Sequence, residues 1–240
     1  MNTRSTVDGW LRRLSFGLLP ATCLLCGAAG AARRDLCDPC RADLQPNPRC
    51  CRRCGLPLAI ASAECGRCLK RPPAYTATWA PFVYLPPLAG LLTRFKFSGD
   101  LAAGRVLAEL ALAQWPASGL SLPQALIPVP LHVDRLRERG YNQALELARP
   151  LALALGVSLV PQGLQRLHAT PAQSGLSALA RRRNLRKAFA VPAGTALPAH
   201  VALLDDVMTT GATAHECALA LRRAGVQRVD VWAVARAPKA

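Results

Sequence analysis

The chain has 240 residues, 51% of them apolar, and a formal charge of +16 at neutral pH. This length predicts one or two domains with room for a sizeable core. No segment approaches the run of about 18 uncharged apolar residues that a membrane span needs, and the first residues make a poor export signal, so we expect a cytoplasmic protein with no membrane span. The basic charge favours phosphate-rich partners, either nucleotides or nucleic acid. An ordinary basic surface is the alternative.

Apolar residues near the start of the chain follow helical spacing, with two arginines on the opposite face. The apolar positions are Val7, Trp10, Leu11, Leu14 and Leu18. This pattern predicts an N-terminal helix within residues 1–20 that packs on the body of the protein. A role at a membrane surface is a weaker alternative, because the segment is short.

Eight of the ten cysteines form four Cys-x-x-Cys pairs between residues 21 and 70. The pairs are Cys23/Cys26, Cys37/Cys40, Cys51/Cys54 and Cys65/Cys68. Each cysteine of the first two pairs recurs 28 residues later, so the segment repeats one unit. One Cys-x-x-Cys turn brings two sulfurs to an ion, and a second turn completes a tetrahedron with Zn–S bonds of about 2.3 Å. The spacing therefore predicts a double zinc ribbon with two structural four-cysteine sites.

The pairing of the cysteines has two solutions. The repeat favours sequential pairing, in which each unit holds its own ion, and an interleaved cross-brace is the alternative. An iron–sulfur cluster is a minor rival to zinc, and Cys50 is a spare thiol beside Cys51. The spacing is typical of a reducing compartment and not of a disulfide-linked secreted protein. The arginines around these pairs fit contact with nucleic acid or with another protein equally well.

Two prolines, Pro72 and Pro73, mark a boundary after the cysteine segment. The patterns that follow predict a strand over residues 78–85 and helices over residues 88–97 and 101–115. The first helix ends in the sequence FKFSGD. Lys96 in this sequence is a candidate ligand for phosphate, and a solvated helix end is the alternative.

A short apolar strand over residues 125–127 runs into Pro128, Val129 and Pro130, which predict an abrupt end and a turn. A basic loop follows, with Arg135, Arg137 and Arg139. Since guanidinium groups pair bidentately with phosphate oxygens, these arginines are candidates for gripping a diphosphate. An arginine-rich solvated helix is the alternative.

The next predicted elements are a helix over residues 142–155, interrupted at Pro150, and a strand over residues 157–160. Residues 168–189 open with turn signals and then form a basic helix.

The segment VALLDDVMTTGAT, residues 201–213, carries the clearest chemistry in the chain. It predicts an apolar strand over residues 201–204 that ends in Asp205 and Asp206, then a tight loop over residues 209–213. A helix over residues 214–224, ended by Gly225, and a final strand over residues 229–234 follow. Ligands bind beyond the carboxyl ends of parallel strands, and a helix N-terminus suits a phosphate. Two adjacent acids suit sugar hydroxyls, a magnesium ion, or both.

Two other interpretations of this segment are weaker. It could be a buried strand whose acids cap the next helix, although the threonine–glycine loop argues against that. It could be the Walker B strand of a P-loop NTPase, but the chain has no G-x-x-x-x-G-K-[ST] motif.

Residues 201–213 resemble the binding motif for phosphoribosyl diphosphate (PRPP) in type I phosphoribosyltransferases. The resemblance implies that Asp205 and Asp206 hold the ribose hydroxyls of PRPP, which binds with Mg²⁺. It also implies a 5-phosphate site formed by Thr209, Thr210, Gly211, Ala212 and Thr213.

The cysteine pairs, FKFSGD, IPVPLH, RERGYNQ and the PRPP motif occur in this order, and together they resemble the ComF family over residues 21–237. The resemblance implies a link to DNA uptake in natural competence, with single-stranded DNA and a DNA-uptake helicase as candidate partners. It makes Lys96, Arg135, Arg137 and Arg139 candidates for the diphosphate. In a mobile loop that closes over the reacting centre, Gln173 and Arg181 are further candidates.

The expected fold is α/β: a mostly parallel sheet of the phosphoribosyltransferase type, with helices on both faces, in residues 74–240. The double zinc ribbon of residues 21–70 precedes it. The leading hypothesis is transfer of a phosphoribosyl group from PRPP to an acceptor, and the sequence shows no base for that acceptor. The rival hypothesis is a DNA-handling protein in which PRPP binding is vestigial or regulatory.

Overall fold

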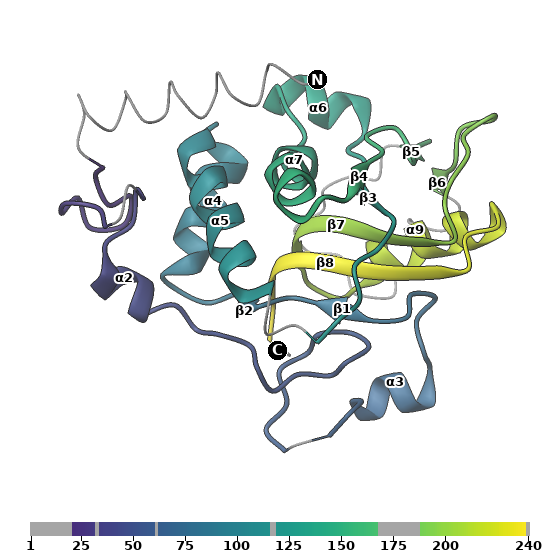
Figure 1. The fold of residues 1–240 in the computed structure, drawn as a ribbon, viewed down its shortest axis with the longest axis horizontal. Helices are drawn as coiled ribbons and strands as arrows, with labels where there is room; N and C mark the ends of the chain where they lie inside the picture. Colours follow the sequence, from purple (N-terminus) through teal and green to yellow (C-terminus); the bar gives the residue numbers. More distant parts are fainter. Residues whose placement is uncertain (1–20, 32–33, 61, 116–118, 168–187, 239–240) are drawn as a thin grey trace.

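A computed structural model describes residues 21–31, 34–60, 62–115, 119–167 and 188–238 (Figure 1). The predicted N-terminal helix and the basic helix of residues 168–189, except its last two positions, lie outside the described residues. Of the helices in the described ranges, none combines the length and the apolar character needed to cross a membrane.

One parallel sheet forms the centre of the protein. Its main path runs through five strands, in the order β1 (Thr78–Trp79), β8 (Arg228–Arg236), β7 (His200–Met208), β3 (Ala125–Pro128) and β4 (Ser158–Leu159). A further short strand, β2 (Phe82–Val83), also pairs with β8, and all of these pairings are parallel. The mostly parallel sheet that the sequence predicts is therefore confirmed.

Helices cover both faces of this sheet, as expected (Figure 1). Three of them, α4 (Leu88–Phe97), α5 (Leu101–Gln114) and α7 (Gln143–Leu155), lie on one face, and α9 (Ala212–Arg223) lies on the other. The cause is the alternation of side chains along β7. Ala202 and Leu204 belong to the first core, with α4, α5 and α7, whereas Val201 and Leu203 belong to the second, with α9.

Two predictions that depended on prolines were wrong. The strand expected over residues 78–85 is two short strands, because Pro81 has no N–H to offer a continuous ladder. In contrast, α7 is not interrupted at Pro150 and runs through it. The missing N–H removes one helical hydrogen bond, but Leu147 and Leu151 on either side are fully buried in the first core and hold the helix in place.

The cysteine segment is joined to the sheet by hydrogen bonds. It contains two short helices, α2 (Asp38–Ala42) and α3 (Gly66–Lys70). The amide of Val83 in β2 donates to Gln45 (2.9 Å), and the amide of Thr78 in β1 donates to Arg52 (3.0 Å). Cysteines of the first repeat pack in the core with α4 and α5, and those of the second repeat pack in the core with α9.

A separate two-stranded antiparallel ladder pairs β5 (Gln165–Arg166) with β6 (Phe189–Ala190). It joins the two ends of the segment in which Gln173 and Arg181 lie. Those two candidates are outside the described residues.

Candidate functional site

The order of the strands places a topological switch point between β3 and β7. The chain passes from β3 through α7 to β4 on one side, and from β7 through α9 to β8 on the other. The two crossover helices lie on opposite faces, so the loops that leave β3 and β7 diverge. Such a switch point at the carboxyl ends of parallel strands is where open α/β sheets bind ligands. Both segments that the sequence selected, after residues 127 and 204, leave the sheet here.

The Nζ atom of Lys96 lies 2.7 Å from Oδ2 of Asp206. Lys96 is near the end of α4, and the side chain of Asp206 is only 7% exposed. The other oxygen, Oδ1, accepts the amide of Val207 at 2.8 Å. The structure therefore brings together two candidates that are 110 residues apart in the sequence. The alternative of a solvated helix end does not hold for Lys96.

Asp205 is part of the strand, contrary to the prediction that the strand ends before the acids. Strand β7 continues to Met208, and the ladder pairs Asp205 with Ala233 of β8. Burial raises the pKa of Asp205 to about 7, and the charge of Asp206 adds to this effect while Lys96 opposes it. A positive charge nearby would favour the ionised form of this carboxyl group.

The loop after β7 is shorter than predicted. Helix α9 begins at Ala212, so only Thr209, Thr210 and Gly211 form the turn, while Ala212 and Thr213 belong to the first helical turn. Gly211 caps the helix with a φ of 75°, a left-handed conformation that favours glycine. The first amides of a helix have no partner within the helix and can donate to an anion. Thr210 Oγ1 accepts one of them, from Ala212, at 3.3 Å.

The basic segment after β3 is a helix and not the loop that the sequence predicted. Helix α6 spans Val133–Arg139, because His132 accepts the amide of Asp134 at its start and Gly140 ends it in a left-handed conformation. Arg137 is exposed, and its Nη1 lies 3.7 Å from Oδ1 of Asp134. The arginine-rich helix that was the alternative is therefore what forms, and in the described part of the chain its arginines form no ion pair with the two acids.

One arginine of α6 contacts the end of α4 through an aromatic ring. The guanidinium carbon of Arg139 lies 5.4 Å from the ring centre of Phe97, which follows Lys96 in α4 and is 73% exposed. Next to this pair, the hydroxyl of Tyr141 donates to the carbonyl of Phe95. The side chain of Asn142 caps α7 and donates to the carbonyl of Val129 at 3.2 Å. These contacts fix the segment RERGYNQ against the end of α4.

The eight paired cysteines form two clusters of four sulfurs. One cluster holds the sulfurs of residues 23, 26, 37 and 40, the other those of residues 51, 54, 65 and 68, and within each cluster all sulfurs lie within 4.8 Å of one another. Sequential pairing is therefore confirmed. Glycines after the first knuckle of each unit adopt a positive φ, 76° at Gly27 and 67° at Gly55, where the sequence placed tight turns.

The geometry of both clusters fits zinc. Four ligands at about 2.3 Å from a tetrahedral zinc ion lie about 3.8 Å apart. The sulfurs of Cys26 and Cys37 are 3.7 Å apart, as are those of Cys54 and Cys65. Burial raises the pKa of the Cys68 thiol, and the neighbouring Cys54 raises it further. A bound cation would favour the thiolate. Closed four-thiolate sites of this kind are structural.

Known proteins are similar to both the cysteine segment and the rest of the chain. Residues 15–69 match the family model of a double zinc ribbon domain. Over 226 residues the chain is 37% identical to the DNA utilization protein YhgH of Salmonella typhimurium, which covers 91% of this chain and 98% of that protein. It is 39% identical over 222 residues to competence protein F of Haemophilus influenzae, covering 90% of this chain and 96% of that protein. This chain belongs to the ComF family.

A more distant ComF relative matches a smaller part of the chain. Competence protein ComFC of Streptococcus pneumoniae is 25% identical over 157 residues, which are 65% of this chain and 67% of that protein.

Two residues of this ComF chain that lie beside the site were not assigned to it from the sequence. Tyr75 is buried against the loop at Gly211, and Arg236 is buried at the end of β8. A single arginine at the end of an apolar strand is a signal that could have drawn attention to Arg236. Tyr75 gives no such signal, because its position depends on contacts distant in the sequence.

Proposed function

We propose that the chain binds PRPP with its Mg²⁺ at the switch point between β3 and β7 and acts as a phosphoribosyltransferase in DNA uptake or use. The observation that carries the proposal is the Lys96–Asp206 pair beside the loop at Gly211. It combines acids for a sugar, a cation for a phosphate and a helix N-terminus at one end of the sheet. The link to DNA follows from the names of the relatives, which refer to competence and DNA utilization.

Each group at this end of the sheet fits one part of PRPP. The amides and hydroxyls of residues 209–213 suit the 5-phosphate, because α9 presents free N–H groups and the positive end of its dipole there. Asp205 and Asp206 suit the two ribose hydroxyls, which donate to carboxylate oxygens. Lys96 holds Asp206 in the unliganded protein and becomes available to the diphosphate when the hydroxyls take over that carboxylate.

The reaction consistent with this arrangement is displacement of diphosphate from C1 of the ribose. The C1–O bond breaks with its electron pair on the diphosphate, while a lone pair of the acceptor forms the new bond to C1 and the acceptor's proton passes to solvent. Positive charge develops on the sugar at the transition state. The carboxylates at residues 205 and 206 stabilise that charge, and cations stabilise the leaving diphosphate, so catalysis is mainly electrostatic positioning.

A second function, handling of single-stranded DNA, is favoured by the exposed ring of Phe97 beneath Arg139. Unpaired bases stack on aromatic rings and on guanidinium planes, and basic surfaces hold the DNA backbone. On this account an affinity for single-stranded oligonucleotide should fall steeply with salt. Substitution of Phe97 by Leu should weaken it about tenfold or more, in line with the loss of one stacking contact.

Calorimetric titration of the zinc-loaded protein with PRPP and Mg²⁺ tests the first proposal. The double variant Asp205→Asn, Asp206→Asn should lose binding. A control that removes two exposed carboxylates elsewhere, Asp38→Asn, Asp43→Asn, should retain it. No binding by the folded, zinc-replete wild type would exclude a working PRPP site. Binding that survives in the double variant would place PRPP elsewhere on the chain.

A further inference from the structure

A buried arginine connects the second cysteine cluster to the loop after β7. Arg236, at the end of β8, is only 3% exposed. Its Nε donates to the carbonyl of Cys54 at 2.9 Å, and its Nη1 donates to the carbonyl of Met208 at 3.1 Å. Cys54 is a ligand of the second cluster, and Met208 is the last residue of β7 before Thr209. One side chain therefore holds the cysteine knuckle and the start of the loop together.

The charge of Arg236 has no carboxylate partner within the described residues. An unpaired buried cation is strongly unfavourable unless another negative group compensates for it. Four thiolates around one zinc ion carry a net negative charge, so the loaded cluster stabilises the arginine that holds the loop.

A buried tyrosine makes a second connection between the same two features. Tyr75 is 1% exposed and packs in one core with Cys51, Cys54, Cys65 and Cys68. A Cβ atom built on Gly211 would lie 2.8 Å from its Oη, so the hydroxyl sits directly against the loop. The ring of Tyr75 therefore lies between the second cysteine cluster and the loop.

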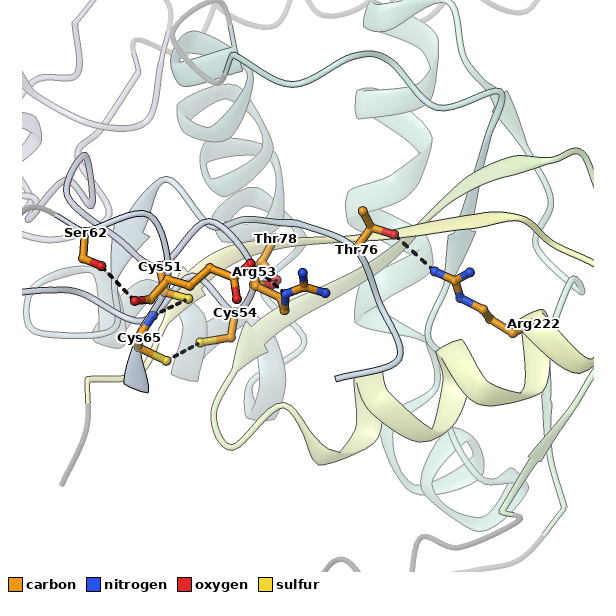
Figure 2. Close-up of polar contacts among 9 residues, drawn as sticks. Cys51, Arg53, Cys54, Ser62, Cys65, Thr76, Thr78 and Arg222 are labelled. Atoms are coloured by element: carbon orange, nitrogen blue, oxygen red, sulfur yellow. Dashed lines mark hydrogen bonds and ion pairs between the residues drawn. The ribbon is translucent and has the colours of Figure 1, made fainter. Parts of the chain in front are cut away.

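The residues around Tyr75 are held by α9, the helix that begins at the loop. The amide of Ala74 donates to Nδ1 of His215 at 3.0 Å, and Nε of Arg222 donates to the carbonyl of Ala74 at 3.0 Å. Figure 2 shows Arg222 reaching Thr76 as well, with Nη2 at 3.3 Å from Oγ1. It also shows the hydroxyl of Thr78 donating to the carbonyl of Arg53, between Cys51 and Cys54, at 2.7 Å.

The first cluster has different neighbours. Around it, Arg94 of α4 donates to the carbonyl of Leu24, and Arg105 of α5 lies 3.6 Å from Asp35. Its cysteines belong to the core on the opposite face of the sheet from Gly211 and Tyr75. The two four-cysteine sites are similar, and it is the second that is linked to the loop through Arg236 and Tyr75. The first site therefore serves as an internal control.

We propose that the second cysteine cluster holds the loop at Gly211 in its binding conformation through Arg236 and Tyr75, so that metal at this cluster and PRPP at the loop strengthen each other's binding. The inference rests on the proposed function only for the identity of the ligand. Because the coupling is reciprocal, PRPP must raise the affinity of the second cluster for zinc by the factor by which zinc raises the affinity for PRPP. Arg236 and Tyr75 are then positioning residues.

Titration of bound zinc with a chelator, with and without PRPP and Mg²⁺, tests the coupling. Cys26→Ser leaves the second cluster intact and changes an exposed cysteine, whereas Cys68→Ser leaves the first intact. We expect PRPP to lower the free-zinc midpoint of the Cys26→Ser protein by about tenfold, within the usual range of coupling, and to leave that of Cys68→Ser unchanged. Equal shifts in both proteins, or none in Cys26→Ser while it still binds PRPP, would overturn the proposal.

Hydrogen exchange of the loop separates this proposal from the identity of the ligand. Without any ligand, removal of zinc from the second cluster should speed amide exchange at residues 209–212 about tenfold or more, because the loop loses its support. Removal of zinc from the first cluster should not. If PRPP fails to bind the wild type but this difference is seen, the proposed function is wrong and the coupling stands. If exchange is unchanged, the coupling is wrong.

Substitution of Arg236 gives a variant that keeps all eight cysteines. Arg236→Gln should retain two zinc ions per chain and weaken PRPP binding about tenfold, and Arg236→Lys should restore part of the loss because it keeps the charge. Retained zinc together with an unchanged PRPP affinity in Arg236→Gln would contradict a positioning role.

Discussion

At the scale of single residues, the pairing of Lys96 with Asp206 combines structure and chemistry. The 2.7 Å contact joins a partly exposed lysine to a carboxylate that is 7% exposed, so it is neither a surface pair nor a fully buried one. Such an ion pair fixes the position of the Asp206 carboxylate but can still be broken, because the lysine can exchange one anionic partner for another. This is a useful property where a diphosphate arrives next to a carboxylate.

Substitution Lys96→Met should weaken both the fold and the site. It leaves the carboxylate of Asp206 without its cation, which should reduce the free energy of unfolding by about 1–3 kcal/mol, between the values for exposed and buried pairs. The affinity for PRPP should fall at least about tenfold if Lys96 contacts the diphosphate. Urea unfolding and calorimetry measure the two effects. Lys70→Met, at an exposed position of α3, is the control and should change neither.

Asp205 should make the stability of the unliganded protein fall with rising pH. Its pKa is raised to about 7, so between pH 4 and pH 7 the native state holds a proton that the unfolded state has released. Stability therefore decreases as pH rises through this window and changes no further above it. Asp205→Asn removes the effect. Its gain in Tm over the wild type at the same pH should be at least about 3 °C larger at pH 8 than at pH 5.5.

The wild type and Asp205→Asn have the same zinc sites. Comparing their Tm values at one pH therefore cancels the effect of pH on those sites. A gain in Tm that is equal at the two pH values would show that the carboxyl of Asp205 does not titrate in this range.

At the scale of elements, the turn between β7 and α9 depends on a single glycine. Gly211 has a φ of 75°, and its missing side chain leaves room for the hydroxyl of Tyr75. Gly194 is a matched control, since its φ is 77° and nothing lies within 4 Å of a Cβ built there. The backbone strain of an alanine, about 1 kcal/mol, is common to both sites.

Gly211→Ala should therefore destabilise the protein more than Gly194→Ala, by about 1–3 kcal/mol, because only the first also meets a neighbour. Addition of Tyr75→Phe removes the hydroxyl in the way and should recover part of that difference. Urea denaturation of the four proteins measures it. Equal losses in the two alanine variants would show that the tyrosine does not press on the loop.

The sequence predicted elements well where the signal was local. The bounds of α4 agree with the prediction, and those of α5 differ by one residue, because caps and apolar spacing lie within the helix itself. Helix α6 was expected as a loop, since its charged face hides the apolar spacing. Strand β7 extends four residues past its predicted end, because the ladder with β8 continues through Asp205 to Met208 and no local pattern encodes a partner strand.

In the candidate site, too, local features were predicted from the sequence and long-range contacts were not. The acids and the threonine–glycine loop were recognised from their order along the chain. The spacing of the cysteines predicted both metal clusters and favoured the sequential pairing that the structure shows. The contacts of Tyr75 and Arg236 could not be predicted, since each joins segments more than 130 residues apart. These two residues can be linked to the site only from the folded structure.

At the scale of the whole molecule, the two zinc clusters are parts of two different cores. Cys23 and Cys37 pack with the face that carries α4, α5 and α7, and the second cluster packs with the face that carries α9. Loss of metal should therefore loosen both layers of the protein. The ribbons are small, so metal binding supplies much of their folding free energy.

Removal of zinc with a chelator at neutral pH should lower the Tm by more than about 5 °C and should broaden the transition. Three tryptophans, Trp79, Trp115 and Trp232, pack on one another with ring centres 4.5–5.3 Å apart in the first core. Their emission should shift to longer wavelength as water enters. Restored zinc should reverse both changes, and an unchanged Tm in zinc-free protein would show that the clusters are dispensable for the fold.

The position of β8 has a consequence for the synthesis of the protein. This strand is the last in the chain, yet it pairs with β1, β2 and β7, and its final residue reaches Cys54. The ribosome makes residues 83–228 at about 5–20 residues per second, so the edge formed by β1 and β2 waits about 7–30 s for its partner. During that interval the nascent chain has its cysteine knuckles complete and its central sheet open. A ribosome that stalls before residue 228 would therefore release a chain that can bind zinc but cannot close its fold.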